Sequence, residues 1–176
     1  MQITADLIDW GWASSAPSAS YFLETLLDDD SADDQFGTSC YDLPGGWADS
    51  TRLHGEIADA LEAALETDLP ISQDILIRAG LTPLFCIDSM VDELGLREFP
   101  DEGYAGSFSP ARIAEISAAL NQGTLDPIAQ MIAGRLPDGE THPEEKRQLV
   151  MRNLEQWRYL LNQAIRENKG LLIHFG

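Results

Sequence analysis

The last third of the chain carries one long amphipathic helix pattern. Thr141 and Glu144 have the spacing of a capping box, and Pro143 lies in the expected first turn. A helix over 143–168 is about 39 Å long at ~1.5 Å per residue. Because a compact domain of this size has a radius of gyration near ~16 Å, such a helix predicts one domain, 1–176, built against it. The apolar residues that define its buried stripe are Val150, Leu154, Trp157, Leu161, Ala164 and Ile165.

Three further helices are expected to start where a capping residue precedes proline, at Thr82-Pro83, Ser109-Pro110 and Asp126-Pro127. The first is expected to continue through Leu94 and to end at Gly95. The second is expected to end before Gly123, a residue type that often follows a helix.

Less regular segments fill the first half of the chain. Leucine and isoleucine at every fourth position predict a helix over 51–67 with acidic residues on its outer face. Residues 11–20 and 28–50 have the composition of loops, and Ser20 is expected to cap a short helix between them. Residues 71–79 fit a buried strand as well as a helix.

The two ends of the chain have strand patterns. Residues 1–10 alternate loosely, and residues 171–175 are apolar on both faces, which is typical of a central strand. The expected fold class is therefore α+β: a single helix-rich domain with a small sheet that includes the N- and C-terminal strands.

The charge of the chain is distributed unevenly. Its 30 acidic and 11 basic residues give a net charge of −19. Residues 1–106 hold 22 acidic and 3 basic residues, whereas residues 107–176 hold 8 of each. The domain thus has an acidic, loop-rich part, 1–106, and a charge-neutral helical part, 107–176, that ends in a strand. Solubility needs a net charge but no such asymmetry, which points to a binding role for the acidic part.

The acidic composition argues against anionic partners, and other sequence features indicate where the protein is located. Phosphate groups would be repelled, so neither direct nucleic-acid binding nor an anionic membrane surface is expected. No apolar run approaches the ~20 residues of a membrane span, and the N-terminus lacks a secretory signal pattern. Cys40 and Cys86 form no disulfide framework, and two reduced thiols fit a cytoplasmic protein.

One short segment concentrates the acidic residues. Five aspartates occupy seven positions, Asp28, Asp29, Asp30, Asp33 and Asp34. Trp10, Trp12 and Trp47 lie in the same acidic part, either as anchors of its loops or as exposed interface residues. We expect the five aspartates and Trp47 to form the partner-binding site.

Patterns typical of catalysis or metal binding are missing from the sequence. There is no His-x-x-x-His, Cys-x-x-Cys or Gly-x-Ser-x-Gly pattern, and the aspartate run lacks the glycine and glutamate of a calcium loop. Paired carboxylates are too common by chance among 30 acidic residues to indicate a site. We therefore expect no catalytic residues, no metal and no cofactor.

Two C-terminal segments carry a family resemblance. Phe108-Ser109-Pro110 with the helix pattern to Leu120, and Leu154 to Leu161 followed by Lys169-Gly170 and Leu171 to Phe175, resemble the YfbM-like family of uncharacterised bacterial proteins. The resemblance covers about 104–176 and implies an α+β domain whose first and last strands share a sheet. It implies no activity and no catalytic residues. Similar small acidic bacterial proteins often serve as immunity partners of toxins.

The leading hypothesis is a non-catalytic acidic binding protein that docks on a basic partner protein, most concretely an immunity or antitoxin-type inhibitor. The alternative is a phage-type nucleic-acid mimic that inhibits a DNA- or RNA-binding protein. The third is an enzyme with a carboxylate-lined pocket. A mimic needs carboxylates spread along one face, an immunity protein needs a local patch, and an enzyme needs a pocket with perturbed acids.

Overall fold

The computed structural model describes residues 3–27, 39–40, 47–66, 73–86, 89–98, 104–136 and 142–175. The fold is α+β, as expected. The chain divides into two compact units, the first formed by Met1–Trp47, Val91–Ala114 and Gln163–Gly176, the second by Ala48–Met90 and Glu115–Asn162. The single domain expected from the sequence stays a prediction.

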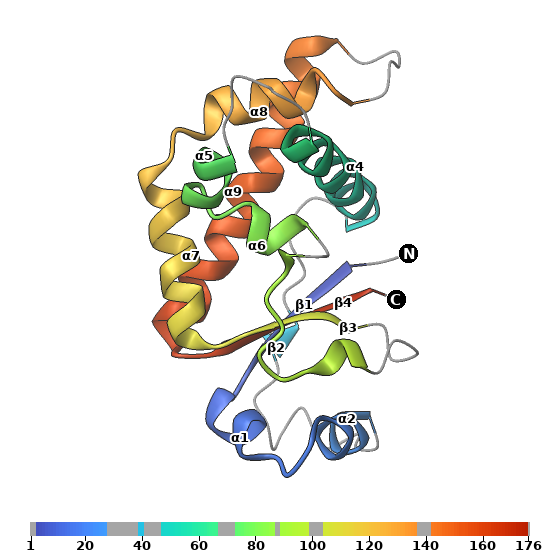
Figure 1. Ribbon diagram of the computed structural model, residues 1–176, viewed down its shortest axis with the longest axis vertical. Helices are drawn as coiled ribbons and strands as arrows, with labels where there is room; N and C mark the ends of the chain where they lie inside the picture. The colour runs from blue at the N-terminus through green and yellow to red at the C-terminus, as the bar shows by residue number, and fades with distance from the viewer. Residues whose placement is uncertain are drawn as a thin grey trace. The chain divides into compact units, whose positions relative to one another are not determined.

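Unit 1 contains an antiparallel sheet of order β2-β1-β4-β3 (Figure 1). Its strands are β1 (Ile3–Ile8), β2 (Ser39–Cys40), β3 (Tyr104–Phe108) and β4 (Gly170–Phe175). The first and last strands pair over six positions, from Ile3 with Phe175 to Ile8 with Gly170. The prediction that both terminal strands share the sheet, with the last one central, is confirmed. Three consecutive buried residues of β4, Leu171, Leu172 and Ile173, explain why its pattern is apolar on both faces.

The segment before β3 covers the outer edge of that strand. The Ser107 amide donates to the Val91 carbonyl (3.0 Å), and the Glu93 amide donates to the Ser107 carbonyl (3.1 Å). The Asp92 carboxylate accepts from the Ser107 hydroxyl (2.6 Å) and from the amides of Leu96 and Arg97 (3.1 and 3.0 Å). These bonds hold the short 3₁₀-helix η2 (Leu96–Glu98) against β3.

The predicted helix from Thr82 to Leu94 is therefore wrong. Among the described residues of this range, the α-helix is limited to α6 (Thr82–Phe85), because the backbone of 91–93 is bonded to β3 instead. Gly95 does follow this segment, with φ +73°, a value that favours glycine.

The predicted loop over 11–20 is also wrong. Helix α1 (Trp10–Ser15) begins where the Trp12 amide donates to the Asp9 carboxylate (3.0 Å). Helix α2 (Ala19–Leu27) begins where the Tyr21 amide donates to the Ser18 hydroxyl (3.1 Å), so Ser18 and not Ser20 is the cap. The short helix expected after residue 20 is thus present as α2, whereas α1 was not expected, because its buried residue, Ala13, gives no periodic pattern.

The predicted loop over 28–50 is partly wrong. It contains β2 and the start of α4 (Trp47–Glu66), while residues 28–38 and 41–46 lie outside the described residues. The remaining helices are α5 (Gln73–Arg78), α7 (Pro110–Gln122), α8 (Leu125–Ala133) and α9 (Pro143–Glu167). Helices α4, α7 and α9 agree with the predicted helices over 51–67, after Ser109-Pro110 and over 143–168. Residues 71–79 were left open by the sequence, and the helix α5 forms from 73 to 78 within them; residues 71 and 72 lie outside the described residues.

The caps differ in detail from the sequence patterns. Ser109 caps α7 by accepting from the Arg112 amide (3.2 Å), as expected. The residue before α6 is Leu81, so Thr82 is inside the helix and not its cap. Helix α8 begins at Leu125, which places Asp126-Pro127 in its first turn.

The capping box expected at the start of α9 also differs in detail. The His142 amide donates to the Glu145 carboxylate (3.2 Å), so Glu145 and not Glu144 closes the capping box. Thr141 lies outside the described residues.

Unit 2 has a helical core. Its buried side chains come from every helix of the unit, and Trp157 is among them, as the helix pattern predicted. They include Leu53, Ile57, Leu61, Leu76, Leu81, Leu84, Phe85, Met90, Ile116, Leu120, Ile128, Ile132, Val150, Leu154, Trp157, Leu160 and Leu161. Within the described part of the chain, no helix is both long and apolar enough to cross a membrane.

Candidate functional site

The predicted partner-binding site falls largely outside the described residues. This applies to Asp28, Asp29, Asp30, Asp33 and Asp34. Trp47 is the first residue of α4, and its side chain likewise lies outside the described part. The candidate sites discussed below therefore come from other residues.

The strongest candidate is the outer side of α4. Gly55, Asp59, Glu62 and Glu66 are exposed and recur at helical spacing, and we call these four residues the acidic face of α4. The opposite side of the helix is buried through Leu53, Ile57 and Leu61 in the core of unit 2. The same periodicity that buries one side thus presents three carboxylates in a row on the other.

This arrangement opposes the electrostatics of the helix. Carboxylates three and four residues apart repel each other by a few tenths of a kcal/mol per pair. Glu66 lies in the last turn, where the helix dipole favours cations, and that turn contains no basic residue. No Lys or Arg occurs between Arg52 and Arg78. The acidic face therefore lowers the stability of the helix that carries it.

Gly55 adds a second cost on the same face. A glycine inside a helix is less favourable than alanine by about 0.5–1 kcal/mol. Among the described residues, nothing lies within 4 Å of a Cβ built at Gly55, so no internal contact requires glycine there. The position leaves the helix backbone open to close approach from outside.

The buried side of α4 is held by an aromatic cluster in unit 2. The His54 ring stacks on Phe85, with centroids 4.4 Å apart and planes tilted by 30°, and lies 5.4 Å from Trp157. Burial lowers the pKa of His54 to about 4, so the imidazole is neutral at neutral pH. This histidine therefore packs as an aromatic residue and fixes which side of α4 faces outward.

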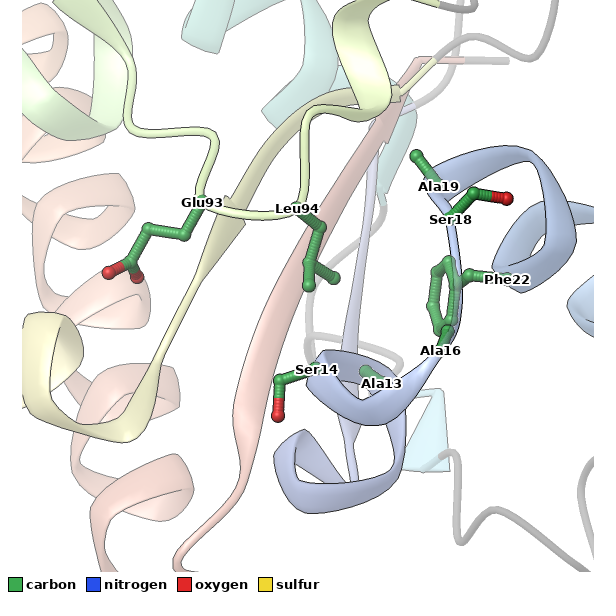
Figure 2. Close-up of a pocket in the computed structure, with 8 residues that line it drawn as sticks. All are labelled: Ala13, Ser14, Ala16, Ser18, Ala19, Phe22, Glu93 and Leu94. Carbon is green, nitrogen blue, oxygen red and sulfur yellow. The ribbon is translucent and has the colours of Figure 1, made fainter.

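A small pocket in unit 1 is the second candidate (Figure 2). It has a volume of about 240 Å³ and lies among α1, the start of α2 and the 91–95 segment. Phe22 and Leu94 reach toward it from opposite sides, whereas the Glu93 carboxylate points away. That carboxylate accepts from the Ser109 amide (2.5 Å). The remaining lining residues are small: Ala13, Ser14, Ala16, Ser18 and Ala19.

A shallower hollow of about 450 Å³ lies along α9 in unit 2, lined by Arg147, Gln148, Met151 and Arg152. Arg147 is bonded to Asp126 and, at 2.7 Å, to Glu144. Gln148 also donates a hydrogen bond to Glu144 (3.1 Å). The hydrogen bonds from Arg147 and Gln148 lower the pKa of the Glu144 carboxyl group to about 2. One of its two arginines, Arg147, is thus already neutralised by two carboxylates, which weakens the hollow as an anion site.

Catalysis by paired carboxylates and metal binding both need several ionisable side chains close together. Neither of the two pockets brings two carboxylates together. The described part of the chain holds no group of three or more His, Cys, Asp or Glu side chains placed to bind a metal ion. Cys86 is a buried thiol rather than half of a disulfide.

Comparisons with known proteins give no further guidance: no family model matches the chain, and no curated protein or solved structure matches it either. The resemblance of residues 104–176 to the YfbM-like family stays a prediction.

Proposed function

We propose that this chain is a non-catalytic acidic binding protein that docks on a basic partner protein through the acidic face of α4. One observation carries the proposal. This face holds three exposed carboxylates and a glycine that no described neighbour requires, and each of these four residues lowers the stability of the helix. Surfaces that are unfavourable for the free protein are typical of binding sites, where function and stability conflict. An inhibitor of a basic toxin is the most concrete form of this function.

Docking proceeds in two physical stages in this proposal. The negative field of the acidic part steers a basic partner toward α4 and raises the association rate by ~10–1000-fold. Gly55 then admits a partner side chain against the helix backbone, because no Cβ stands in its way. The five aspartates at 28–34 and Trp47 belong to the proposal as further contacts predicted from the sequence.

The proposal is tested by removing the charges of the acidic face. The partner is first captured from cells that produce this protein and identified, which supplies the reagent. Association rates are then measured by stopped flow for the triple variant Asp59→Asn, Glu62→Gln and Glu66→Gln. We expect an association rate at least tenfold lower at 0.05 M salt. Raising salt to 0.5 M shortens the Debye length from ~14 Å to ~4 Å and should remove most of this difference.

A matched control separates a local site from net charge. The variant Glu145→Gln, Glu155→Gln and Glu167→Gln removes the same number of exposed carboxylates from α9, in the charge-balanced part of the chain. We expect this control to associate within about threefold of the wild-type rate. Equal losses in both triple variants would show that only net charge matters, and the acidic face would not be the docking surface.

The predicted aspartate cluster is tested separately. Replacing Asp28, Asp29, Asp30, Asp33 and Asp34 by Asn should leave the free energy of unfolding nearly unchanged and should slow association further. If these five changes leave the association rate at low salt untouched, the cluster takes no part in docking, while the acidic face of α4 is unaffected by that result.

A further inference from the structure

The pocket in unit 1 has walls and surroundings that select for one kind of ligand. Phe22, Leu94 and three alanines form the apolar part of its lining, and Ser14, Ser18 and the stem of Glu93 form the rest (Figure 2). A volume of about 240 Å³ accommodates about eight groups of the size of water, fewer than ordinary ligand sites of ~300–1,000 Å³. The pocket therefore fits a short aliphatic chain or a single side chain.

The charges around the pocket are of one sign. The segments that build its walls, 9–27 and 91–95, contain Asp9, Glu24, Asp92 and Glu93 and no Lys or Arg. Arg97 lies 3.7 Å from the Asp92 carboxylate and offsets that one charge. The formal charge of these segments is negative, which favours a cationic group over an anionic one at the mouth of the pocket.

The hydroxyl groups of the lining residues add to this selectivity. Ser14 donates its proton to the Trp10 carbonyl (2.7 Å), so its oxygen is left only as an acceptor. The Ser18 oxygen already accepts from the Tyr21 amide. An ammonium group has three donors and no acceptor, and therefore matches the Ser14 oxygen, whereas a carboxylate does not.

From these three observations we infer that the pocket binds a primary alkylammonium group, with its aliphatic chain against Phe22 and Leu94 and its charge at the rim near Ser14. This site lies in unit 1 and does not depend on the acidic face of α4. The chemistry is shared by the side chain of a lysine in a peptide and by a free aliphatic amine.

The test uses three probes of equal length: n-pentylammonium, n-pentanol and n-pentanoate. Each is titrated into the full chain, labelled with ¹³C at its alanine methyl groups, at pH 7 and low salt. Ala13, Ala16 and Ala19 report on the pocket, and Ala60 and Ala129, buried in unit 2, report on unspecific effects. We expect saturable shifts of the three pocket methyls, with n-pentylammonium at least tenfold tighter than n-pentanol and with n-pentanoate unbound.

Two additions identify the source of the amine and the location of binding. The first is a blocked Gly-Lys-Gly peptide with its norleucine counterpart. If the lysine peptide shifts the same methyl signals and the norleucine peptide does not, the natural ligand is a lysine side chain. If n-pentylammonium binds and neither peptide does, the natural ligand is a free amine. The variant Ala19→Leu fills the pocket and should abolish the shifts, whereas Ala118→Leu, at an exposed position of α7, should not. The inference is overturned if n-pentanol binds within twofold of n-pentylammonium, or if the wild-type protein shows no saturable shift at these methyls.

Discussion

The imidazole ring of His54 stacks on the phenyl ring of Phe85, with 4.4 Å between their centroids. His54 is buried and the acidic face of the same helix is exposed, so this contact helps to fix the outward direction of Asp59, Glu62 and Glu66. The stability of the aromatic cluster and the presentation of the proposed docking surface are therefore linked through α4.

The first prediction concerns the pH dependence of stability. The pKa of His54 is about 4 in the folded protein and near 6.5 in the unfolded chain. Between these values the unfolded chain binds the extra proton, so the free energy of unfolding falls as pH drops from about 6.5 toward about 4. We expect a loss of roughly 2 kcal/mol between pH 7 and pH 5 from this residue, measured by urea denaturation.

The variant His54→Leu serves as its control. Leucine keeps the site apolar and has no titrating group. Between pH 7 and pH 5 the wild type should therefore lose roughly 2 kcal/mol more of its free energy of unfolding than the variant loses. Parallel pH profiles for the two proteins would show that His54 is not buried in its neutral form.

The second prediction concerns Trp157, which is 3% exposed and lies 6.0 Å from Phe85 between ring centroids. The change Trp157→Ala leaves a cavity in the core of unit 2 and should lower the free energy of unfolding by ~3–5 kcal/mol. Tyr159, on the same helix and 55% exposed, is the matched position: Tyr159→Ala should cost less than ~1 kcal/mol. Similar losses for both variants would contradict the orientation of α9.

The third prediction concerns Gly80, which has φ +67°. A Cβ at this position would lie 2.8 Å from the Ile116 carbonyl oxygen on α7. Both the backbone conformation and this contact disfavour a side chain, so Gly80→Ala should destabilise the protein by roughly 1–3 kcal/mol. Denaturation midpoints equal to wild type would mean that α7 does not pack against this turn.

The fourth prediction concerns Gly55, where the same substitution should have the opposite effect on stability. Gly55→Ala meets no neighbour among the described residues and should stabilise the protein by about 0.5–1 kcal/mol. At the same time it should weaken binding of the captured basic partner, because the added methyl group stands where the partner approaches the helix. A stabilised variant with unchanged affinity would remove Gly55 from the docking surface.

The sequence predicts those parts of the fold that depend on local patterns. The helix over 143–168 follows from uninterrupted periodicity, the first strand from a loose alternation and the last from a short run that is apolar on both faces. Helix α1 and the exact start of α2 were missed because each helix begins at a single side-chain cap, Asp9 or Ser18, within a segment of small residues. The error over 82–94 has a different cause: Asp92 pairs with Ser107, 15 residues further along the chain, and this contact overrides helix propensity.

The candidate site was only partly predictable. The carboxylates of residues 51–67 were expected on an outer face, and Gly55 stands in that pattern as an interior glycine. What the sequence could not provide is the open space around Gly55, which depends on the packing of the rest of the unit. The pocket in unit 1 was missed because most of its lining comes from α1 and the start of α2, within residues 11–20, which were expected to be a loop.

The central claim is that a basic partner contacts the acidic face of α4. The most direct measurement is a backbone amide NMR titration of the ¹⁵N-labelled protein with the captured partner. We predict that shifts or line broadening concentrate at Gly55, Asp59, Glu62 and Glu66, while the exposed carboxylate residues Glu145 and Glu155 of α9 change little. Unchanged signals from all four residues of the acidic face, with the partner bound elsewhere, would contradict the claim.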